Sequence, residues 1–324
     1  MSANGALRSR VRPVGAVSRP RFALVLAIVI ASLAVAPQAL ATNTIGVKVT
    51  TKPKSASRST TAAFAWRTAG RVTRTLCALD RGRFAKCSRH RTYKHLKNGL
   101  HTFRVEAVGA TTKRVASYRW RVDTVAPSAP LAAGGSAAWQ SVASIVVSAA
   151  GSTDGGSGLA GYQRRSSVDG GVTWSTGTAG GQLTAGAGGE TLVQFRALDR
   201  AGNASAWSPA TGTAGAIARI DRDAPSAPLV AGGSLQWRNA VSVDVTGAGA
   251  IDVGGAGVDH YEYRTSTDGV IWSLGTTGSD VAVTDPGETL VEFRAVDAAG
   301  NASSWAPLLA DGGSTVRIDR TIPT

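Results

Sequence analysis

The sequence predicts an all-β protein, a tandem array of three antiparallel β-sandwich modules that follows a signal peptide. Three observations predict this fold. A long segment recurs after 98 residues, one alternating strand pattern occurs three times, and short apolar runs are separated by regular turn signals with no convincing helix between them. Several short strands at this spacing are typical of a two-sheet sandwich.

The internal repeat defines the second and third modules. Residues 126–130 read Ala-Pro-Ser-Ala-Pro, and residues 224–228 repeat them. The segment Thr-Leu-Val-Gln-Phe-Arg-Ala-Leu-Asp at 191–199 returns with two substitutions at 289–297. The same shift relates three pairs of tryptophans: Trp139 and Trp237, Trp174 and Trp272, and Trp207 and Trp305. We therefore predict two copies of one module.

A divergent first module precedes these copies. Its closing segment, Val-Asp-Thr-Val-Ala-Pro at 122–127, is similar to the segments that close the other two modules. Modules of roughly 80 to 100 residues are large enough for one hydrophobic core each. The predicted ranges are 42–124 for module 1, 125–222 for module 2 and 223–324 for module 3.

One strand of each module has a buried face and a solvated face, because apolar residues occupy every second position. These positions are Phe103, Val105 and Ala107 in module 1, Val193, Phe195 and Ala197 in module 2, and Val291, Phe293 and Ala295 in module 3. Asp-Gly pairs at 169–170 and 268–269 predict hairpins. The runs between turn signals predict six or seven strands in each module.

Longer motifs carry a family resemblance. Tyr-x-x-Arg-x-Ser-x-Asp-Gly…Trp, followed by Phe-Arg-Ala-x-Asp-x-Ala-Gly-Asn-x-Ser, begins at Tyr162 and again at Tyr261. With these motifs, modules 2 and 3 resemble bacterial immunoglobulin-like repeats. Module 1 resembles a related variety through Cys-Ala-Leu-Asp at 77–80 and Tyr-Arg-Trp-Arg-Val-Asp at 118–123, but lacks Asp-x-x-Gly-Asn at 108–113. The resemblance implies immunoglobulin-like or fibronectin-III-like sandwiches that act as spacers or adhesive modules of secreted or cell-surface proteins.

Residues 1–41 form a predicted secretory signal peptide. The first 21 residues carry five arginines and no acid, a 15-residue apolar run follows, and Ala-Leu-Ala ends the segment. Fifteen apolar residues are fewer than the roughly 20 that span a bilayer, so cleavage after Ala41 is favoured over retention as an anchor. We expect a secreted, extracellular or envelope-associated protein with no integral membrane span after cleavage.

Cys77 and Cys87 are the only cysteines. They are equally spaced about Gly82, so a hairpin that turns at residues 81–83 would bring them face to face across two strands. An oxidising extracellular compartment would preserve the bond. We predict a structural disulfide, because the spacing and the lack of further ligands do not suit a redox or metal site.

Positive charge is concentrated in module 1. The chain has a net charge of +14, and module 1 holds 19 lysines and arginines against three acids, whereas module 3 holds five against 13. The densest stretch has no acidic residue. Its cations are the candidates for binding an anionic polymer: Arg81, Arg83, Lys86, Arg89, Arg91, Lys94 and Lys97.

This stretch has two interpretations, a solvated face and a surface for an anionic partner. The partner would be an anionic cell-wall polymer, an acidic polysaccharide, lipid headgroups or extracellular DNA. Few aromatic residues interleave the cations, so we expect no specific nucleic acid. Other surface proteins are a further alternative, including the acidic module 3 of a neighbouring chain.

The repeated tryptophans also have two interpretations. A large aromatic residue at the same place in two repeats usually packs against the core or its edge, and we favour this role. Trp174 and Trp272 could instead stack on the sugar rings of a glycan. Asn-Ala-Ser at 203–205 and 301–303 matches the glycosylation sequon, but its place after Asp-x-Ala-Gly indicates a turn.

We expect no required cofactor, although the acidic loop residues Asp252, Asp259 and Glu262 could hold Ca²⁺ through oxygen ligands. Residues 167–174 match the Ser-x-Asp-x-Gly-x-Thr-Trp turn of sialidase propellers, which is a hairpin device and not a catalytic one. The repeat is also about twice the length of a propeller blade.

No catalytic set is apparent in the sequence. His90, His95 and His101 all lie in module 1, and neither G-x-S-x-G nor H-E-x-x-H occurs. We predict a secreted, non-catalytic spacer or adhesive protein whose module 1 docks on an anionic envelope polymer. The alternative is an array of carbohydrate-binding modules that uses exposed tryptophans.

Overall fold

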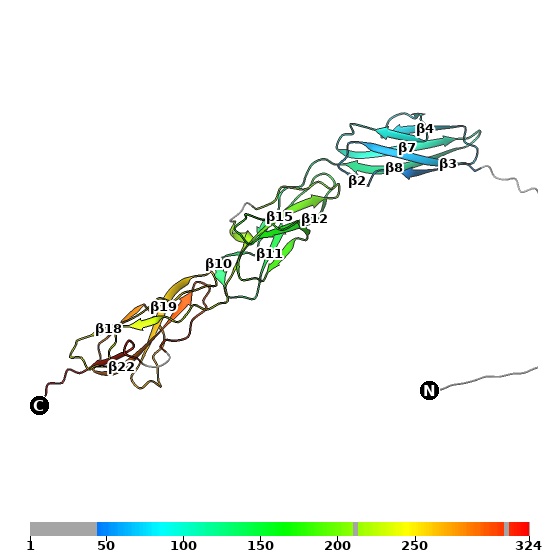
Figure 1. Ribbon diagram of the computed structural model, residues 1–324. Helices are drawn as coiled ribbons and strands as arrows, with labels where there is room; N and C mark the ends of the chain where they lie inside the picture. Colours follow the sequence, from blue (N-terminus) through cyan, green and yellow to red (C-terminus); the bar gives the residue numbers. More distant parts are fainter. Residues whose placement is uncertain (1–43, 210–212, 308–310, 324) are drawn as a thin grey trace, which may run out of the picture. The chain divides into compact units, whose positions relative to one another are not determined.

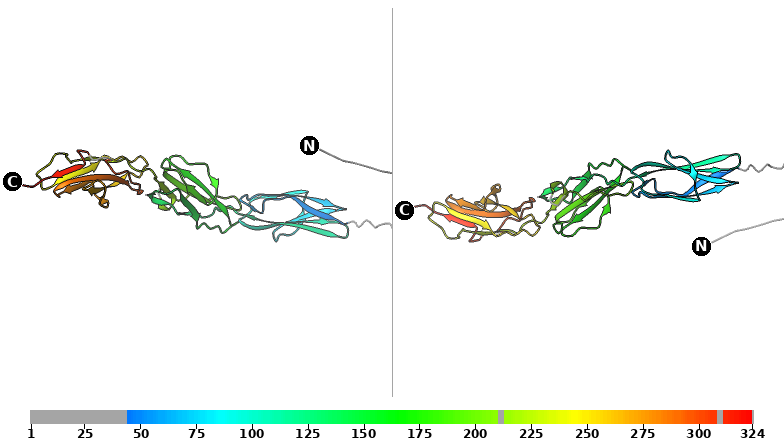
Figure 2. Two further views of the ribbon diagram at one scale, coloured as in Figure 1. Left: turned by 90° about the horizontal axis from the view of Figure 1, so that it is seen from below. Right: turned by 90° about the horizontal axis from the view of Figure 1, so that it is seen from above.

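The computed structural model describes residues 44–209, 213–307 and 311–323 (Figure 1). The predicted leader lies outside the described residues. Within them, the regular structure is β-strand apart from one three-residue 3-10 helix, Ala214–Ala216. The strands form six sheets, two in each of three sandwiches, and Figure 2 shows them from two further directions. The predicted all-β array of antiparallel β-sandwich modules is confirmed.

Module 1 is a sandwich of a three-stranded and a five-stranded sheet. One sheet has the order β1-β3-β6 and the other the order β2-β8-β7-β4-β5. All pairs are antiparallel except the short edge pair of β2 with β8. The strands are β1 (Gly46–Thr51), β2 (Ala56–Ser57), β3 (Ala62–Ala69), β4 (Arg74–Leu79), β5 (Ala85–Lys86), β6 (His90–Tyr93), β7 (Gly99–Val108) and β8 (Lys113–Val122).

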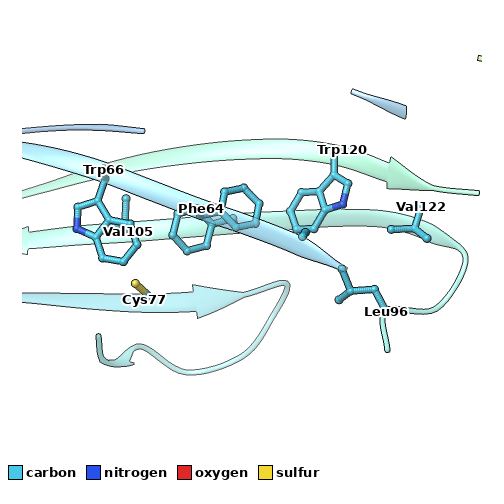
Figure 3. Packing of buried hydrophobic residues seen from close by; sticks show 9 residues of the cluster. Phe64, Trp66, Cys77, Leu96, Val105, Trp120 and Val122 are labelled. Carbon is cyan, nitrogen blue, oxygen red and sulfur yellow. The ribbon is translucent and has the colours of Figure 1, made fainter. Parts of the chain in front are cut away.

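The core of module 1 lies between these two sheets and is rich in aromatic residues (Figure 3). Phe64 of β3 stacks on Phe103 of β7 with ring centroids 4.2 Å apart, and Trp120 of β8 packs beside Phe64 at 5.0 Å. All three side chains are almost completely buried. Each buried aromatic side chain contributes about 1.5–3 kcal/mol through removal of apolar surface from water, so this cluster accounts for much of the module's stability.

Module 2 pairs a five-stranded sheet, β10-β16-β15-β12-β13, with a three-stranded sheet, β14-β11-β9. Strand β10 lies parallel to β16, and the other pairs are antiparallel. The strands are β9 (Leu131–Ala133), β10 (Ser136–Gln140), β11 (Ile145–Ala150), β12 (Leu159–Ser167), β13 (Thr178–Ala179), β14 (Gln182–Ala185), β15 (Gly189–Asp199) and β16 (Ile217–Ile220).

Module 3 repeats this plan with sheets β20-β19-β22-β23 and β17-β18-β21. A single bridge between Arg238 and Ile318 stands where module 2 has the β10–β16 pair. The strands are β17 (Leu229–Ala231), β18 (Val243–Ala248), β19 (Val258–Ser266), β20 (Thr276–Thr277), β21 (Asp280–Val283), β22 (Gly287–Asp297) and β23 (Thr315–Ile318).

The strand predicted three times from its alternation is β7 in module 1, β15 in module 2 and β22 in module 3. Its central phenylalanine (Phe103, Phe195 or Phe293) has no exposed surface in any module, so the predicted buried face is confirmed. Each module has its own core cluster built around this residue.

The predicted hairpins at the Asp-Gly pairs are longer than a two-residue turn. Strand β12 does pair with β13, but the first paired residues are Arg164 and Thr178, so the connection spans residues 168–177. Asp169 explains the difference, because its carboxylate accepts hydrogen bonds from the Thr173 backbone N–H and from the Ser167 hydroxyl. These side-chain contacts close a local turn in place of a β-ladder.

Candidate functional site

The disulfide predicted in module 1 is confirmed. Cys77 of β4 and Cys87, the residue after β5, are bonded with their Cα atoms 5.8 Å apart. The register differs from the prediction by two residues, because Cys77 lies opposite Ala85 and not opposite Cys87, so the bond joins a diagonal pair. The Thr75 hydroxyl donates to the carbonyl oxygen of Cys87 at 2.8 Å, so the segment after β5 is held against the start of β4.

The seven candidate cations of module 1 are all exposed, but they do not share one sheet. Arg81 and Arg83 lie in the β4–β5 connection, and Lys86 ends β5 in the five-stranded sheet. Arg89 and Arg91 lie at β6 in the other sheet, and the two lysines follow that strand. The stretch therefore distributes its charge over both sheets, which the sequence spacing did not reveal.

Among the described residues, one of the 19 cations of module 1 has an acidic partner, compared with four of the eleven arginines of modules 2 and 3. Within the described part of module 1, Lys113 is the one lysine or arginine in an ion pair, with Glu106 at 3.4 Å. Modules 2 and 3 instead contain cross-strand pairs of arginine with glutamate: Arg219 with Glu190, Arg264 with Glu292, Arg294 with Glu262 and Arg317 with Glu288. Module 1 therefore presents positive charge that nothing in the described chain neutralises.

The repeated tryptophans of module 2 alternate with arginines on one face of a sheet. The Arg165 guanidinium lies over the rings of both Trp174 and Trp207, and Arg196 lies over Trp207, each 4.6 Å from the ring centroid. Burial lowers the pKa of Arg165, and the positive charge of Arg196 lowers it further. We call this stack the tryptophan–arginine ladder of module 2.

Module 3 has the same ladder with stronger charge compensation. Arg264 lies over Trp272 and Trp305, again at 4.6 Å, and donates to the Glu292 carboxylate at 2.7 Å. In module 2 the equivalent Arg165 donates to the neutral amide oxygen of Gln194. Cation–π stacking of this kind contributes about 0.5–2 kcal/mol for each pair.

In both ladders the candidate sugar-stacking tryptophans pack against arginines. Trp174 and Trp272 are half-buried, and an arginine covers a face of each ring. The indole N–H of Trp174 also donates to the carbonyl oxygen of Gly171 at 3.0 Å. Packing at the sheet edge therefore accounts for the contacts of both residues, and sugar stacking on them stays a prediction.

The Asp-x-Ala-Gly-Asn motif makes the contact between successive modules. Asp199 accepts hydrogen bonds from the backbone of the turn that follows β15, including the N–H of Asn203 at 2.8 Å. The side-chain amide of Asn203 then donates to the carbonyl oxygen of Asp123, the last buried residue of module 1, at 2.9 Å. Asn301 makes the same contact with the carbonyl oxygen of Asp221. These asparagines act as turn residues, as their sequence context indicates, and also as junction residues, which the sequence did not indicate.

Three carboxylates converge at each of these junctions, with oxygen atoms that all lie within 4.8 Å of one another. The sets are Asp123, Asp154 and Asp199 at the first junction, and Asp221, Asp252 and Asp297 at the second. In each set two aspartates are buried and the middle one is half-buried. No ion pair of the described chain involves any of the six. Closely spaced carboxylate oxygens are the ligands that Ca²⁺ prefers.

Some oxygen atoms of these carboxylates accept hydrogen bonds from the surrounding backbone. Burial by itself raises the pKa of Asp123, but hydrogen bonds from Ser157 and Val125 and the attraction of Arg121 bring it below its ordinary value. The loop approaches Asp123 so closely that a Cβ at Gly156 would overlap the carboxylate, which explains why the position is glycine. The equivalent Gly254 has the same relation to Asp221.

The structure separates the acidic residues that the sequence grouped as Ca²⁺ ligands. Asp252 joins the second junction set. Asp259 instead contacts the ring of His260 at 2.8 Å, and Glu262 accepts from Arg294 at 2.6 Å. Sequence reasoning missed the buried members of each set because they lie at the ends of strands in two different modules.

The histidines form no nucleophile–base arrangement among the described residues. The His101 ring contacts the Asp80 carboxylate at 2.9 Å on one side and the carbonyl oxygen of Lys97 on the other, so both ring nitrogens are occupied. His90 and His95 are exposed. No helix in the described part of the chain is long and apolar enough to cross a membrane.

Comparison with known proteins gives partial relatives. No family model matches the chain. A match to exoglucanase B of Cellulomonas fimi extends over 213 residues at 37% identity, covering 63% of this chain, which spans 18% of the length of that protein. Among solved structures, the FN1–FN3 domains of chicken CNTN1 are 13% identical with a TM-score of 0.30, covering 84% of this chain and 97% of that one. Domains A168–A170 of titin are 12% identical with a TM-score of 0.35, covering 81% and 96%.

Proposed function

We propose that this chain is a secreted, non-catalytic array of sandwich modules whose module 1 binds an anionic polysaccharide of a cell envelope or extracellular matrix. The observation that carries the proposal is the unpaired positive charge of module 1, where Lys113 is the one cation in an ion pair within the described residues. Polysaccharides that bear carboxylate, sulfate or phosphate groups would neutralise this charge. Modules 2 and 3, in which four of the eleven arginines pair with glutamates, would serve as the spacer.

Two features support an extracellular polysaccharide over other anions. The disulfide of module 1 is typical of proteins outside the reducing cytoplasm. The partial relative, exoglucanase B, is by its name a glucanase, and the match covers 63% of this chain. The junction contact of Asn203 would hold module 2 to module 1, and that of Asn301 would hold module 3 to module 2.

The test compares binding of the full chain to polygalacturonate beads and to neutral dextran beads. The variant Arg81→Gln/Arg83→Gln removes two exposed, unpaired cations of module 1, and Arg200→Gln/Arg238→Gln removes two exposed arginines of modules 2 and 3 with the same change in charge. We expect the first variant to bind polygalacturonate several-fold more weakly and the second to bind like the parent chain. Equal weakening by both variants, or equal capture on both kinds of bead, would contradict the proposal.

The alternative function is neutral-glycan binding by the tryptophans. The relative named exoglucanase B makes this a second candidate, and Trp174 and Trp272 occupy equivalent positions in two modules. It requires the uncovered face of each ring to accept a sugar. Cello-oligosaccharide that protects tryptophan fluorescence from acrylamide in the parent chain, but not in Trp174→Phe/Trp272→Phe, would favour this candidate over the anionic polymer.

We also propose that Ca²⁺ stabilises the two junctions. The support is the recurrence of three close carboxylates at equivalent places in both copies, two of them buried in each set. Asp154→Asn and Asp252→Asn each remove one charge from a half-buried position of a set. Millimolar Ca²⁺ is expected to raise the unfolding temperature of the parent chain by several degrees and that of the double variant by less. An unchanged parent curve with Ca²⁺ and with chelator would contradict this role.

A further inference from the structure

A surface cavity of about 570 Å³ lies at the end of module 1 where the chain crosses from one sheet to the other. Its lining comes from the end of β3, the connection to β4, the start of β4 and the residue before β6. Arg74 pairs with Val108, the last residue of β7, whereas the junction with module 2 follows Val122, which pairs with the first residue of β7. The cavity therefore lies at the opposite end of the β7–β8 ladder from the junction.

Three arginines line this cavity: Arg67, Arg74 and Arg89. All three are exposed, and none has an ion pair or a side-chain hydrogen bond within the described residues. They converge from both sheets, and 22 residues separate the first from the last in the chain. Guanidinium groups bind carboxylate, sulfate and phosphate oxygens through paired N–H donors, and several around one cavity reinforce one another.

The wall of the cavity holds a further unmet donor. Trp66 is 3% exposed and lines the cavity, and its indole N–H is buried without a hydrogen-bond partner. Figure 3 shows Trp66 at one end of the core cluster with its nitrogen on the side away from Phe64. A buried donor without a partner costs about 1–3 kcal/mol, so an acceptor oxygen that reaches it on small movement of the lining would gain stabilisation.

The backbone around the cavity is fixed before any ligand arrives. Gly70 has a φ of +73°, and a Cβ there would lie 2.8 Å from the carbonyl oxygen of Thr44, so the connection accepts only glycine. On the other side, Thr75 is bonded to the backbone of Cys87, which the disulfide ties to β4. Arg89 follows two residues later, and its carbonyl oxygen accepts from the N–H of Trp66 at 3.3 Å. A rigid cavity loses little entropy on binding.

From these observations we infer that this cavity is the specific binding site for one acidic sugar unit of the polymer, and that its anionic group binds the guanidinium groups of Arg67, Arg74 and Arg89. The threonines at positions 68, 73 and 75 give the wall a polar character suited to sugar hydroxyls. The inference rests on the proposed function and assigns it a defined site. Two of its three arginines lie outside the dense cationic stretch of the sequence.

The test measures binding of the full, oxidised chain to three trisaccharide probes by isothermal titration calorimetry. The probes are trigalacturonate, a sulfated trisaccharide and neutral maltotriose, which distinguish a carboxylate, a sulfate and no charge. Arg67→Gln/Arg74→Gln/Arg89→Gln removes the arginines of the cavity. Lys54→Gln/Arg114→Gln/Arg119→Gln removes the same charge from exposed positions that do not line it.

We expect the parent chain to bind at least one acidic trisaccharide and not maltotriose. The cavity variant should bind that probe at least tenfold more weakly, which corresponds to the loss of about one charge-assisted contact. The control variant should stay within about twofold of the parent, because a short probe senses distant charges weakly through screening. Trp66→Phe, which keeps the ring in the core and removes the N–H, should weaken binding severalfold with a near-parental unfolding temperature.

The outcomes separate this inference from the proposed function. Equal weakening of trisaccharide binding by both triple variants would overturn the cavity and leave polymer binding by diffuse charge. Capture of the parent chain by polygalacturonate beads without binding of either acidic trisaccharide would overturn it in the same way. Failure of the parent chain to bind the beads at low salt would overturn the proposed function itself.

Discussion

At the scale of single residues, the aromatic core and the surface cations have separate roles. Phe103 is completely buried between the sheets of module 1, and the cations that surround it on the outside have, apart from Lys113, no acidic partners within the described residues. Substitutions in the two groups therefore affect different properties. The core residues determine whether module 1 folds, and the exposed cations are the residues through which we propose that it binds a polymer.

Truncation of the core phenylalanine should destabilise module 1 strongly. Phe103→Ala removes a buried ring that stacks on Phe64 and leaves a cavity, which costs about 3–5 kcal/mol. Urea denaturation followed by tryptophan fluorescence measures the change. Leu100→Ala on the same strand is the matched control, because Leu100 is 50% exposed and should cost less than about 1 kcal/mol. A similar loss from both variants would contradict the assigned core.

The carboxylate of Asp169 should make the stability of module 2 depend on pH. Hydrogen bonds from Ser167 and Thr173 hold the pKa of Asp169 well below its ordinary value. Since the pKa is lower in the folded than in the unfolded chain, the stabilisation is complete above the unfolded value near 4 and is lost as the pH falls below it. Thermal unfolding between pH 2 and 6 measures this, and Asp169→Asn should flatten the acid side of the curve. An unchanged slope in the variant would contradict the role of the carboxylate.

At the scale of elements, the disulfide and the junction turn are short structures that hold longer ones in place. The Cys77–Cys87 bond ties the segment after β5 to β4, where Arg74 lies at the cavity. The turn after β15 connects Asp199 to Asn203 and through it to the end of module 1. The disulfide and the junction turn each fix the position of a residue relative to a segment that is distant from it in the sequence.

Removal of the disulfide should destabilise module 1 selectively. Cys77→Ser/Cys87→Ser opens a small loop, and such bonds typically contribute about 2–4 kcal/mol. Hydrogen exchange followed by mass spectrometry separates the modules. Protection should fall in β4 and β5 and remain at the parental level in β15 and β22, and uniform loss over all three modules would contradict independent cores.

The junction asparagine should couple modules 1 and 2. Asn203→Ala removes the donor to the carbonyl oxygen of Asp123 and also a hydrogen bond to Asp199 at 2.6 Å. The expected cost is about 1–3 kcal/mol, because the acceptors are largely buried. Calorimetry should show the unfolding of module 1 separating from that of module 2. Ala204→Ser is the control, because it changes the neighbouring half-buried position and removes no side-chain hydrogen bond. Identical unfolding profiles of the variant and the control would contradict the coupling.

The sequence predicted those elements whose physical signal is local. Alternation at Phe103, Phe195 and Phe293 identified β7, β15 and β22, because one face of a strand is read directly from every second residue. Two-residue strands such as β5 and β13 carry no such period, which explains why the predicted six or seven strands fall short of the eight found in the described parts of modules 1 and 2. The disulfide register differed by two residues for a related reason, since the position of the turn is set by the ladder.

The candidate sites were less accessible to sequence reasoning because they are assembled from distant segments. The charge excess of module 1 is visible in the composition, but Arg67 and Arg74 reach Arg89 only through the crossing between sheets. Likewise Asp123, Asp154 and Asp199 come from three separate segments in two modules. The arginines that lie over Trp174 and Trp207 were not anticipated, and Trp237 is 58% exposed although packing was favoured for all the repeated tryptophans.

At the scale of the whole molecule, charge distinguishes the modules from one another. Module 1 carries 19 lysines and arginines against three acids, and module 3 carries 13 acids against five arginines. Cross-strand pairing neutralises four of the eleven arginines in the repeats, whereas the described part of module 1 leaves its cations, Lys113 excepted, without an acidic partner. An attachment module followed by neutral or acidic spacers is the arrangement that this gradient supports.

The salt dependence of polymer binding tests this account most directly. Binding of the full chain to polygalacturonate is measured at a series of sodium chloride concentrations, with neutral dextran alongside. The account predicts that the logarithm of the affinity falls linearly and steeply with the logarithm of the salt concentration, because several guanidinium and ammonium groups displace counterions from the polymer. An affinity that stays constant across the series, or equal binding to dextran, would contradict it.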